Sequence, residues 1–345
     1  MKLVNLFLIE APFQLVSATQ AVKCDPEGAR ILIVRRTGLT KNDKQVTAVL
    51  ENVKDQWDTI IHVDTTNLFK LIYDLLSIKL RLLFSWNKVN VLALGDFRSL
   101  FGRIFCKCFS YNNLWFLDDG IASLDLFHEQ DGEIKLKPKH LQSKKIEGYY
   151  RSIDSINTPR ITLKTFLDVK SEAPFFVEHV NLTDAFLKDK MKKRTFDDNL
   201  VFFLGAKLVE AGFLDKKAYF GVCEKVAKTY ENKKIVYVPH RQECQSSIAE
   251  IVEHFKFDVL ELELPVEFYL CGLDCLPRHV VSVCSAALCT IPEIFPEIRV
   301  GVVDFERTNM AKTEREGFDL CYSYLFFKSK ANMLSEKQES QSNDF

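Results

Sequence analysis

The sequence predicts two α/β domains, each with a parallel sheet covered by helices on both faces. Short apolar runs of strand length alternate throughout with longer stretches of helical period, which is typical of this fold class. The chain has 345 residues, and a length of this order favours two domains of roughly 150 residues each. Apolar residues make up 47% of the chain, so each domain can bury an ordinary hydrophobic core.

The first domain, a Rossmann-like fold that includes a crossover segment, is predicted over residues 1–190. Its strands are expected at 3–9, 30–34, 59–63, 89–94 and 114–117, and its helices at about 11–23, 41–54, 66–85 and 97–108. The alternation weakens from Asp118 to about Asp197, which we assign to loops and the crossover. Within that stretch, Asp131-Gly132 lies between two short apolar runs and predicts a hairpin turn.

The second domain, also Rossmann-like, is predicted over residues 191–328. Its strands are expected at 200–204, 234–238, 257–260 and 280–284, and its helices at about 214–231, at about 245–255 and shortly after Pro265. Residues 329–345 are rich in Ser, Lys, Glu and Gln and hold few apolar side chains. We expect this polar tail to be disordered, because it has little surface to bury.

Composition and charge exclude several classes of protein. The formal net charge is -1, which argues against a nucleic-acid partner. The ten cysteines form no CxxC pair, so we expect reduced thiols and no metal site. The N-terminus lacks the features of a signal peptide, and the most hydrophobic long window, residues 68–86, contains four charged residues. These features predict a cytoplasmic protein.

Common nucleotide-binding and hydrolase motifs are missing from the sequence. It contains no GxGxxG, no Walker A sequence, no HExxH and no GxSxG. Their absence argues against dinucleotide-dependent enzymes, P-loop nucleoside triphosphatases, zinc proteases and serine hydrolases of the usual types.

Polar residues follow the predicted strands at six points. In open parallel sheets the ligand lies outside the carboxyl ends of the strands, so these are the residues to consider first. In the first domain they are residues 10–14, 95–98 and 118–120. In the second domain they are Gly205, residues 239–243 and Ser285. We expect the six points to converge on one cleft.

The segment Asp118-Asp119-Gly120 predicts a general base at a strand end. One carboxylate can face the cleft while its neighbour turns into the protein, where repulsion between them raises one pKa. The alternative is that the three residues form only a polar turn.

His240 and Arg241 follow a β-branched strand, and an imidazole beside a guanidinium suits an anionic phosphate. The alternative is a histidine at the protein surface. Ser285 starts a segment of helical character and would offer a hydroxyl and backbone N–H groups to a phosphate. The alternative there is a simple helix N-cap.

Taken together, these motifs resemble those of the bacterial sialyltransferases and capsule polysialyltransferases. Residues 116–120, Phe-Leu-Asp-Asp-Gly, match the acidic-acidic-Gly motif of that family, and residues 9–14 resemble its N-terminal Pro-x-Gln turn. The family's His-Pro motif is altered here, because Pro239 precedes His240 and Arg241 follows it. Its Ser-Ser/Thr motif is incomplete, because Ala286 follows Ser285.

The resemblance implies a GT-B fold, in which two Rossmann-like domains face a central cleft, and an inverting transfer of sialic acid from CMP-sialic acid. It implies Asp119 as the base for the acceptor hydroxyl, and His240 as the group that protonates or hydrogen-bonds the leaving phosphate of CMP. Glu267 would hold the cytidine ribose and Ser285 the phosphate. The remaining expected residues are Arg241 and Gly205 at the donor, and Pro12, Gln14, Asp118 and Gly120 at the acceptor or in the cleft.

No cofactor is expected beyond the donor substrate, and the resemblance implies independence of metal because the chain contains no Asp-x-Asp. The acceptor would be a hydroxyl of a bacterial cell-surface glycan, namely a lipooligosaccharide or lipopolysaccharide, an O-antigen or a capsule. Two alternatives stay open. One is a transferase that uses CMP-Kdo or a UDP-hexose. The other is a non-catalytic subunit of a glycan assembly complex, which the Arg241 and Ala286 departures would favour.

Basic residues among apolar ones also suggest peripheral contact with the inner membrane. Lys70, Lys79, Arg81, Arg103 and Lys107 fit a pair of helices resting on an anionic leaflet. The alternative is an ordinary solvated helix face packed on its sheet.

Overall fold

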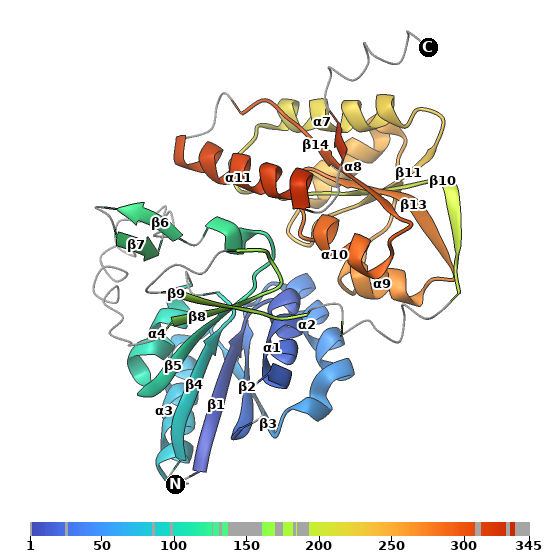
Figure 1. Cartoon of the computed structure of the whole chain (residues 1–345). Helices are drawn as coiled ribbons and strands as arrows, with labels where there is room; N and C mark the ends of the chain where they lie inside the picture. Colours follow the sequence, from blue (N-terminus) through green and yellow to red (C-terminus); the bar gives the residue numbers. More distant parts are fainter. Residues whose placement is uncertain are drawn as a thin grey trace. The chain divides into compact units, whose positions relative to one another are not determined.

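The computed structural model describes residues 2–24, 27–84, 87–96, 99–125, 127–130, 133–136, 161–169, 175–181, 184, 193–307, 312–328 and 332–334. The chain divides into two compact units, residues 1–185 and residues 186–345. Each unit contains one parallel sheet flanked by helices (Figure 1). Among the described residues, no helix has the length and apolar character needed to cross a membrane.

The sheet of unit 1 has seven strands in the order β3-β2-β1-β4-β5-β8-β9. All are parallel: β1 (Lys2–Ile9), β2 (Ala29–Arg36), β3 (Thr59–Asp64), β4 (Asn87–Leu94), β5 (Tyr111–Leu117), β8 (Ile161–Thr165) and β9 (Phe175–His179). The strand order reverses between β1 and β4. Such a switch point is where doubly wound sheets bind ligands, at the carboxyl ends of the strands.

Helices cover both faces of this sheet (Figure 1): α1 (Pro12–Cys24) and α2 (Thr40–Val53) on one side, and α3 (Leu68–Phe84) and α4 (Leu100–Cys108) on the other. On the second face, Ile78 and Leu82 of α3 join Phe101 and Phe105 of α4 in one buried cluster with the strands. Short 3-10 turns η1 (Lys54–Gln56) and η2 (Ala122–Asp125) complete the connections.

The predicted hairpin is present as two antiparallel strands, β6 (Phe127–Gln130) and β7 (Glu133–Leu136), and its turn residues Asp131-Gly132 lie outside the described residues. The assignment of the rest of the stretch from Asp118 to Asp197 to loops and the crossover was wrong in part, because β8 and β9 extend the sheet. Lys164 interrupts the apolar sequence pattern of β8, although its side chain is only 2% exposed. Its ammonium lies 3.9 Å from the centre of the Trp115 ring and pairs with Glu178 of β9.

The sheet of unit 2 has six strands in the order β12-β11-β10-β13-β14-β15, again all parallel. They are β10 (Thr195–Leu204), β11 (Lys234–Val238), β12 (Asp258–Val259), β13 (Cys275–Ser282), β14 (Arg299–Val303) and β15 (Asn332–Leu334). The helices are α7 (Lys216–Thr229), α8 (Gln245–Phe255), α9 (Val266–Gly272), α10 (Ala287–Ile294) and α11 (Lys312–Lys328). The switch point lies between β10 and β13.

Unit 2 differs from the sequence prediction at its C-terminal end. Residues 332–334, assigned above to the polar tail, pair with residues 301–303 as the edge strand β15. Strands pair through backbone hydrogen bonds, so a segment of three residues, too short to show a strand pattern in the sequence, can still join a sheet. Residues 335–345 lie outside the described residues.

Candidate active site

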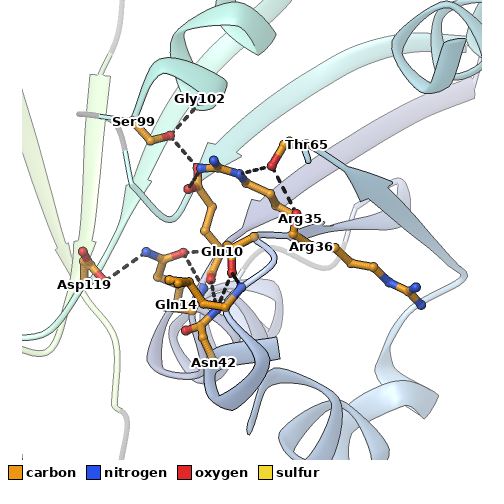
Figure 2. A network of polar contacts seen from close by, with 12 residues as sticks. Glu10, Gln14, Arg35, Arg36, Asn42, Thr65, Ser99, Gly102 and Asp119 are labelled. Atoms are coloured by element: carbon orange, nitrogen blue, oxygen red, sulfur yellow. Dashed lines mark hydrogen bonds and ion pairs between the residues drawn. The ribbon is translucent and has the colours of Figure 1, made fainter. Parts of the chain in front are cut away.

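Gln14 connects the switch point of unit 1 to the Asp-Asp-Gly segment. Its side-chain Oε1 accepts hydrogen bonds from the backbone N–H of Glu10 (2.7 Å) and of Ala11 (3.2 Å). Its Nε2 donates to Oδ1 of Asp119 at 2.9 Å (Figure 2). Because two backbone donors hold Oε1, the amide can present only its NH2 group to Asp119. The position of the Asp119 carboxylate is therefore tied to the end of β1.

Gly95, the residue after β4, gives Gln14 its space. Its backbone N–H donates to the carbonyl of Leu8 at 2.8 Å. A Cβ at this position would overlap the Gln14 side chain, whose own Cβ would be 2.8 Å away. Glycine at this strand end is thus required by the close approach of Gln14.

Glu10 is buried behind Gln14 in a network of donors (Figure 2). Its carboxylate accepts from Ser99 Oγ at 2.5 Å and from Nη1 of Arg35. Its backbone carbonyl accepts from Nδ2 of Asn42 at 2.8 Å. Burial raises the pKa of Glu10 above its ordinary value, against the opposing effects of the Arg35 charge and the Ser99 hydrogen bond. The network fixes the backbone from which Gln14 extends.

The two neighbouring carboxylates of the Asp-Asp-Gly segment point to different surroundings. Asp118 is fully buried and accepts from the Thr165 hydroxyl and the Phe166 N–H, both at 2.7 Å. Asp119 is half-buried, and its backbone N–H donates to Ser123 Oγ at 3.0 Å. Gly120 has φ +71°, a conformation that side-chain-bearing residues rarely adopt.

The pKa of Asp118 is raised to about 7, as expected of one of the two carboxyl groups. Its cause differs from the sequence-based expectation. Burial is the largest effect, and repulsion by Asp119 is the smallest of those acting on the pKa of Asp118.

A second network of buried polar groups lies at the carboxyl ends of β10 and β11 in unit 2. The Glu243 carboxylate accepts from the Tyr237 hydroxyl at 2.5 Å, from the Tyr219 hydroxyl at 3.4 Å and from the backbone N–H of His240. Burial raises the pKa of Glu243 to about 7. A Cβ on Gly205 would overlap Glu243 and come within 2.6 Å of the Tyr237 oxygen. The glycine after β10 is therefore required by this network.

The imidazole of His240 is held in one tautomer. The backbone N–H of Gln242 donates to its Nδ1 at 3.2 Å, which leaves Nε2 as the nitrogen that carries the proton. Burial, together with the smaller effects of the positive charges of Arg241 and Lys207, lowers the pKa of His240 to about 3. His240 is thus a neutral hydrogen-bond donor at pH 7, in surroundings that favour an anion.

Glu267 and Ser285 lie around the start of α10. Glu267, in the first turn of α9, is buried and accepts from the Thr290 hydroxyl at 2.6 Å. Burial raises its pKa. Ser285 Oγ accepts from the backbone N–H of Ala287 at 3.2 Å, while the N-cap position of α10 itself is occupied by Ala286, which has no capping side chain.

Of the residues predicted from sequence, the structure brings together Pro12, the first residue of α1, with Gln14 and Asp118-Asp119-Gly120 in unit 1. In unit 2 Glu243 lies against Gly205 and accepts from the backbone N–H of His240, so it links these two residues. Residues 97 and 98 lie outside the described residues.

Sequence reasoning missed the partners that hold these residues in place. They are Glu10, Arg35, Asn42 and Ser99 in unit 1, and Tyr219, Tyr237 and Glu243 in unit 2. Two of these partners could have been predicted, because Glu10 and Glu243 belong to the strand-end segments 10–14 and 239–243. The tyrosines gave no signal, since an aromatic residue fits a buried strand or helix position without a polar role.

The fold is shared with several solved structures. A protein of Listeria monocytogenes described as a UDP-N-acetylglucosamine 2-epimerase matches with 11% identity and a TM-score of 0.52, over 100% of this chain and 98% of the other. The UDP-GlcNAc 2-epimerase of Neisseria meningitidis matches with 11% identity and a TM-score of 0.51, over 96% and 95%. Phytolacca americana UGT2 matches with 13% identity and a TM-score of 0.50, over 98% and 87%.

At these identities the likeness shows the fold alone, and it extends over both Rossmann-like domains, as predicted for a GT-B protein. A search of curated proteins finds no match. The family model described as alpha-2,8-polysialyltransferase matches residues 5–304. The chain therefore belongs to the alpha-2,8-polysialyltransferase family, and it is a sialyltransferase with a GT-B fold.

Proposed function

We propose that the enzyme transfers sialic acid from CMP-sialic acid to a hydroxyl of a bacterial cell-surface glycan, with inversion at the anomeric carbon. As a glycosyltransferase it takes a nucleotide-sugar donor and a glycan acceptor. The acceptor would be a lipooligosaccharide, O-antigen or capsule chain, and the family description makes a sialic-acid-ended glycan the first to test. The observation that carries the proposal is the Asp119 carboxylate, held by Gln14 at the carboxyl end of a doubly wound sheet.

Asp119 would act as the general base. It takes the proton of the acceptor hydroxyl as the acceptor oxygen bonds to the anomeric carbon, and the bond from that carbon to the CMP phosphate breaks. A single displacement of this kind inverts the anomeric centre. Gln14 supports the role because it fixes one carboxylate oxygen, and Asp118 supports it by tying the neighbouring backbone to Phe166.

His240 would stabilise the leaving CMP through the proton on Nε2. A neutral imidazole donates a hydrogen bond without first having to be charged, and Arg241 and Lys207 supply positive charge near it. An approaching phosphate would itself raise the pKa of His240 and favour the imidazolium form, which would then give its proton to the leaving phosphate and return to the neutral imidazole. Gly205 would let the backbone approach the donor closely.

Further donor contacts belong to the same proposal. Thr290 donates to Oε1 of Glu267, and a carboxylate held in this way retains acceptor capacity for ribose hydroxyls. Ser285 would place the N-terminus of α10 against the phosphate. Pro12, Asp118 and Gly120 would shape the acceptor side. The described residues include no group of three or more His, Cys, Asp or Glu side chains suited to a metal, and we propose that the reaction needs neither metal nor cofactor.

The test is CMP release from CMP-sialic acid, measured with EDTA present and with galactose-ended and sialic-acid-ended acceptors. Asp119→Asn and His240→Asn are the active-site variants, and Asp55→Asn and His254→Gln, at exposed positions, are the matched controls. Loss of a general base or acid should lower turnover by about 100-fold to 10,000-fold, while both controls should retain it.

Two results would overturn the proposal. If CMP-sialic acid is neither bound nor consumed, the donor is wrong, and CMP-Kdo and UDP-hexoses become the substrates to try. If the wild type binds CMP-sialic acid but does not hydrolyse it even slowly, the chain acts as a non-catalytic subunit.

A further inference from the structure

Helix α3 of unit 1 exposes a continuous apolar stripe. Its exposed apolar side chains are Phe69, Ile72, Tyr73, Leu76 and Leu80, with Phe69 85% and Tyr73 71% exposed. The positions recur every three or four residues, so they share one face of the helix. We call these five residues, together with the exposed Lys70, Lys79 and Arg81, the outer face of α3.

The fold does not use this stripe. The opposite face of the helix carries Ile78 and Leu82, which are buried in the core, and Leu71 and Leu75, which pack against it. Those contacts already attach α3 to the sheet. Large apolar side chains left exposed on the other side indicate a surface with a further partner.

The charges on the outer face have one sign. Among residues 69–82 of α3, the exposed charged side chains are Lys70, Lys79 and Arg81. The one acidic residue of this stretch, Asp74, is half-buried and accepts from the backbone N–H of Asp64. Asp64 also lies 3.5 Å from the Lys70 ammonium.

The neighbouring helix does not contribute as the sequence suggested. Arg103 of α4 is only 2% exposed, and Phe101 and Phe105 are buried in the core. The expectation of a basic helix pair was therefore wrong at Arg103, although Lys107 of α4 is exposed, and the apolar stripe with its bordering cations lies on α3.

We propose that the outer face of α3 docks on an anionic lipid bilayer. A surface helix that is aromatic and aliphatic along one stripe, and bordered by Lys and Arg, lies in the plane of the membrane interface, with its apolar side chains among the acyl chains. The cations then meet lipid phosphates. A second copy of the chain fits less well, because a two-fold pairing of α3 would bring like charges together.

The test is sedimentation of the full chain with vesicles of phosphatidylcholine, alone or mixed with phosphatidylglycerol. We expect binding to the mixed vesicles that weakens as salt is added. The double variant Phe69→Gln/Leu76→Gln and the double variant Lys79→Glu/Arg81→Glu should each weaken binding by about tenfold or more. Phe327→Gln on α11, where Phe327 is 77% exposed, and Lys44→Glu on α2 are the matched controls.

All four variants change exposed side chains, so thermal melting should show an unaltered fold, and CMP release with a soluble acceptor should stay at the wild-type level. The proposal fails if the wild type does not bind mixed vesicles, or if Phe327→Gln weakens binding and the α3 variants do not. It also fails if the α3 variants change the mass of the protein in solution from a dimer to a monomer. That last result would identify a second copy as the partner of the outer face.

Discussion

Asp118 in unit 1 and Glu243 in unit 2 are both buried carboxyl groups at the end of a strand, and burial raises the pKa of each to about 7. Their donors differ. Asp118 accepts from the hydroxyl of Thr165, the last residue of the adjacent strand β8, and from the N–H of the next residue, so it ties two strand ends together. Glu243 is bonded by two tyrosine hydroxyls and by the backbone of His240 itself. The first carboxyl supports the fold beside Asp119, and the second directly positions a proposed catalytic residue.

The largest expected effect is that of removing each carboxyl group. Glu243→Ala leaves three donors without this acceptor, and Asp118→Ala leaves two. At about 1–3 kcal/mol for each unsatisfied group, we expect the free energy of unfolding to fall by about 3 kcal/mol or more for Glu243→Ala and by about 2 kcal/mol for Asp118→Ala. Urea denaturation followed by circular dichroism measures both.

The exposed glutamate Glu250 on α8 supplies the control, and Glu250→Ala should change stability by about 0.5 kcal/mol or less. CMP release should separate the two carboxyl groups further. Glu243→Ala should lower turnover at a temperature where the variant is fully folded, because the His240 backbone has lost its acceptor. Equal turnover for the folded Glu243→Ala and wild-type proteins would show that Glu243 does not position His240.

The next largest effect is on the pH dependence of stability. Folding raises the pKa of Glu243 from 4.5 and that of Asp118 from 3.8, each to about 7, so the folded state binds protons that the unfolded state releases. Each group therefore stabilises the protein at low pH, and this contribution is lost as pH rises toward 7. The slope is about 1.4 kcal/mol per pH unit for each group at most.

Glu243→Gln and Asp118→Asn should each remove one such slope between about pH 5 and pH 7, as measured by urea denaturation at a series of pH values. Above pH 7 the difference in slope from the wild type should vanish. If the wild type and these variants instead show the same slope between pH 5 and pH 7, the two carboxyl groups are ionised in the folded protein as they are in the unfolded one, and the assignment is wrong.

A smaller effect is expected from adding a methyl group beside each network. Gly205→Ala would press on Glu243 and Tyr237, and Gly95→Ala would press on Gln14. Overpacking of this kind costs about 1–3 kcal/mol. Both variants should also lower CMP release, because one moves the His240 loop and the other moves the partner of Asp119.

Gly221 on α7 provides the control, since a Cβ there would meet nothing within 4 Å, and Gly221→Ala should leave activity unchanged and stabilise its helix slightly. Full activity of Gly95→Ala would show that the side chain of Gln14 can move without consequence for Asp119.

The fold could be predicted from sequence where strands are apolar, as in β1, β4 and β10. It could not be predicted at β8, where Lys164 is buried by a cation–π contact that only the folded sheet provides, nor at β15, whose three residues join the edge through backbone pairing. Positions of site residues followed from one rule, that ligands lie at the carboxyl ends of parallel strands. Asp119, Gln14 and His240 were predicted in that way.

Neither the direction in which these side chains point nor their protonation could be predicted from the sequence. The positive φ of Gly120 and the hydrogen bonds of Thr165 and Phe166 decide which aspartate is buried. The pKa of His240, lowered to about 3, results from burial beside Arg241 and Lys207, and Lys207 comes from a different loop. Contacts between segments distant in sequence leave no local pattern, which is why the network around Glu243 was missed.

The smallest expected effect comes from two hydroxyl groups, one in each unit, that make matching hydrogen bonds. Thr165 donates to Asp118 at 2.7 Å and accepts from the N–H of Leu167 at 3.0 Å. Tyr219 donates to Glu243 at 3.4 Å and accepts from the N–H of Ala206 at 3.1 Å. Thr165→Val and Tyr219→Phe remove each hydroxyl while nearly preserving shape, so each should cost about 1 kcal/mol of stability.

Both hydroxyl groups also lower the pKa of the carboxyl group that they bond, so both variants should raise that pKa further and extend the fall in stability to higher pH. The shift should be larger for Thr165→Val, because its hydrogen bond is the shorter one. Denaturation at pH 6, 7 and 8 measures the shift, with Thr47→Val on the exposed face of α2 as the control. A larger shift for Tyr219→Phe would mean that Tyr219, rather than Tyr237, is the main hydroxyl donor to Glu243.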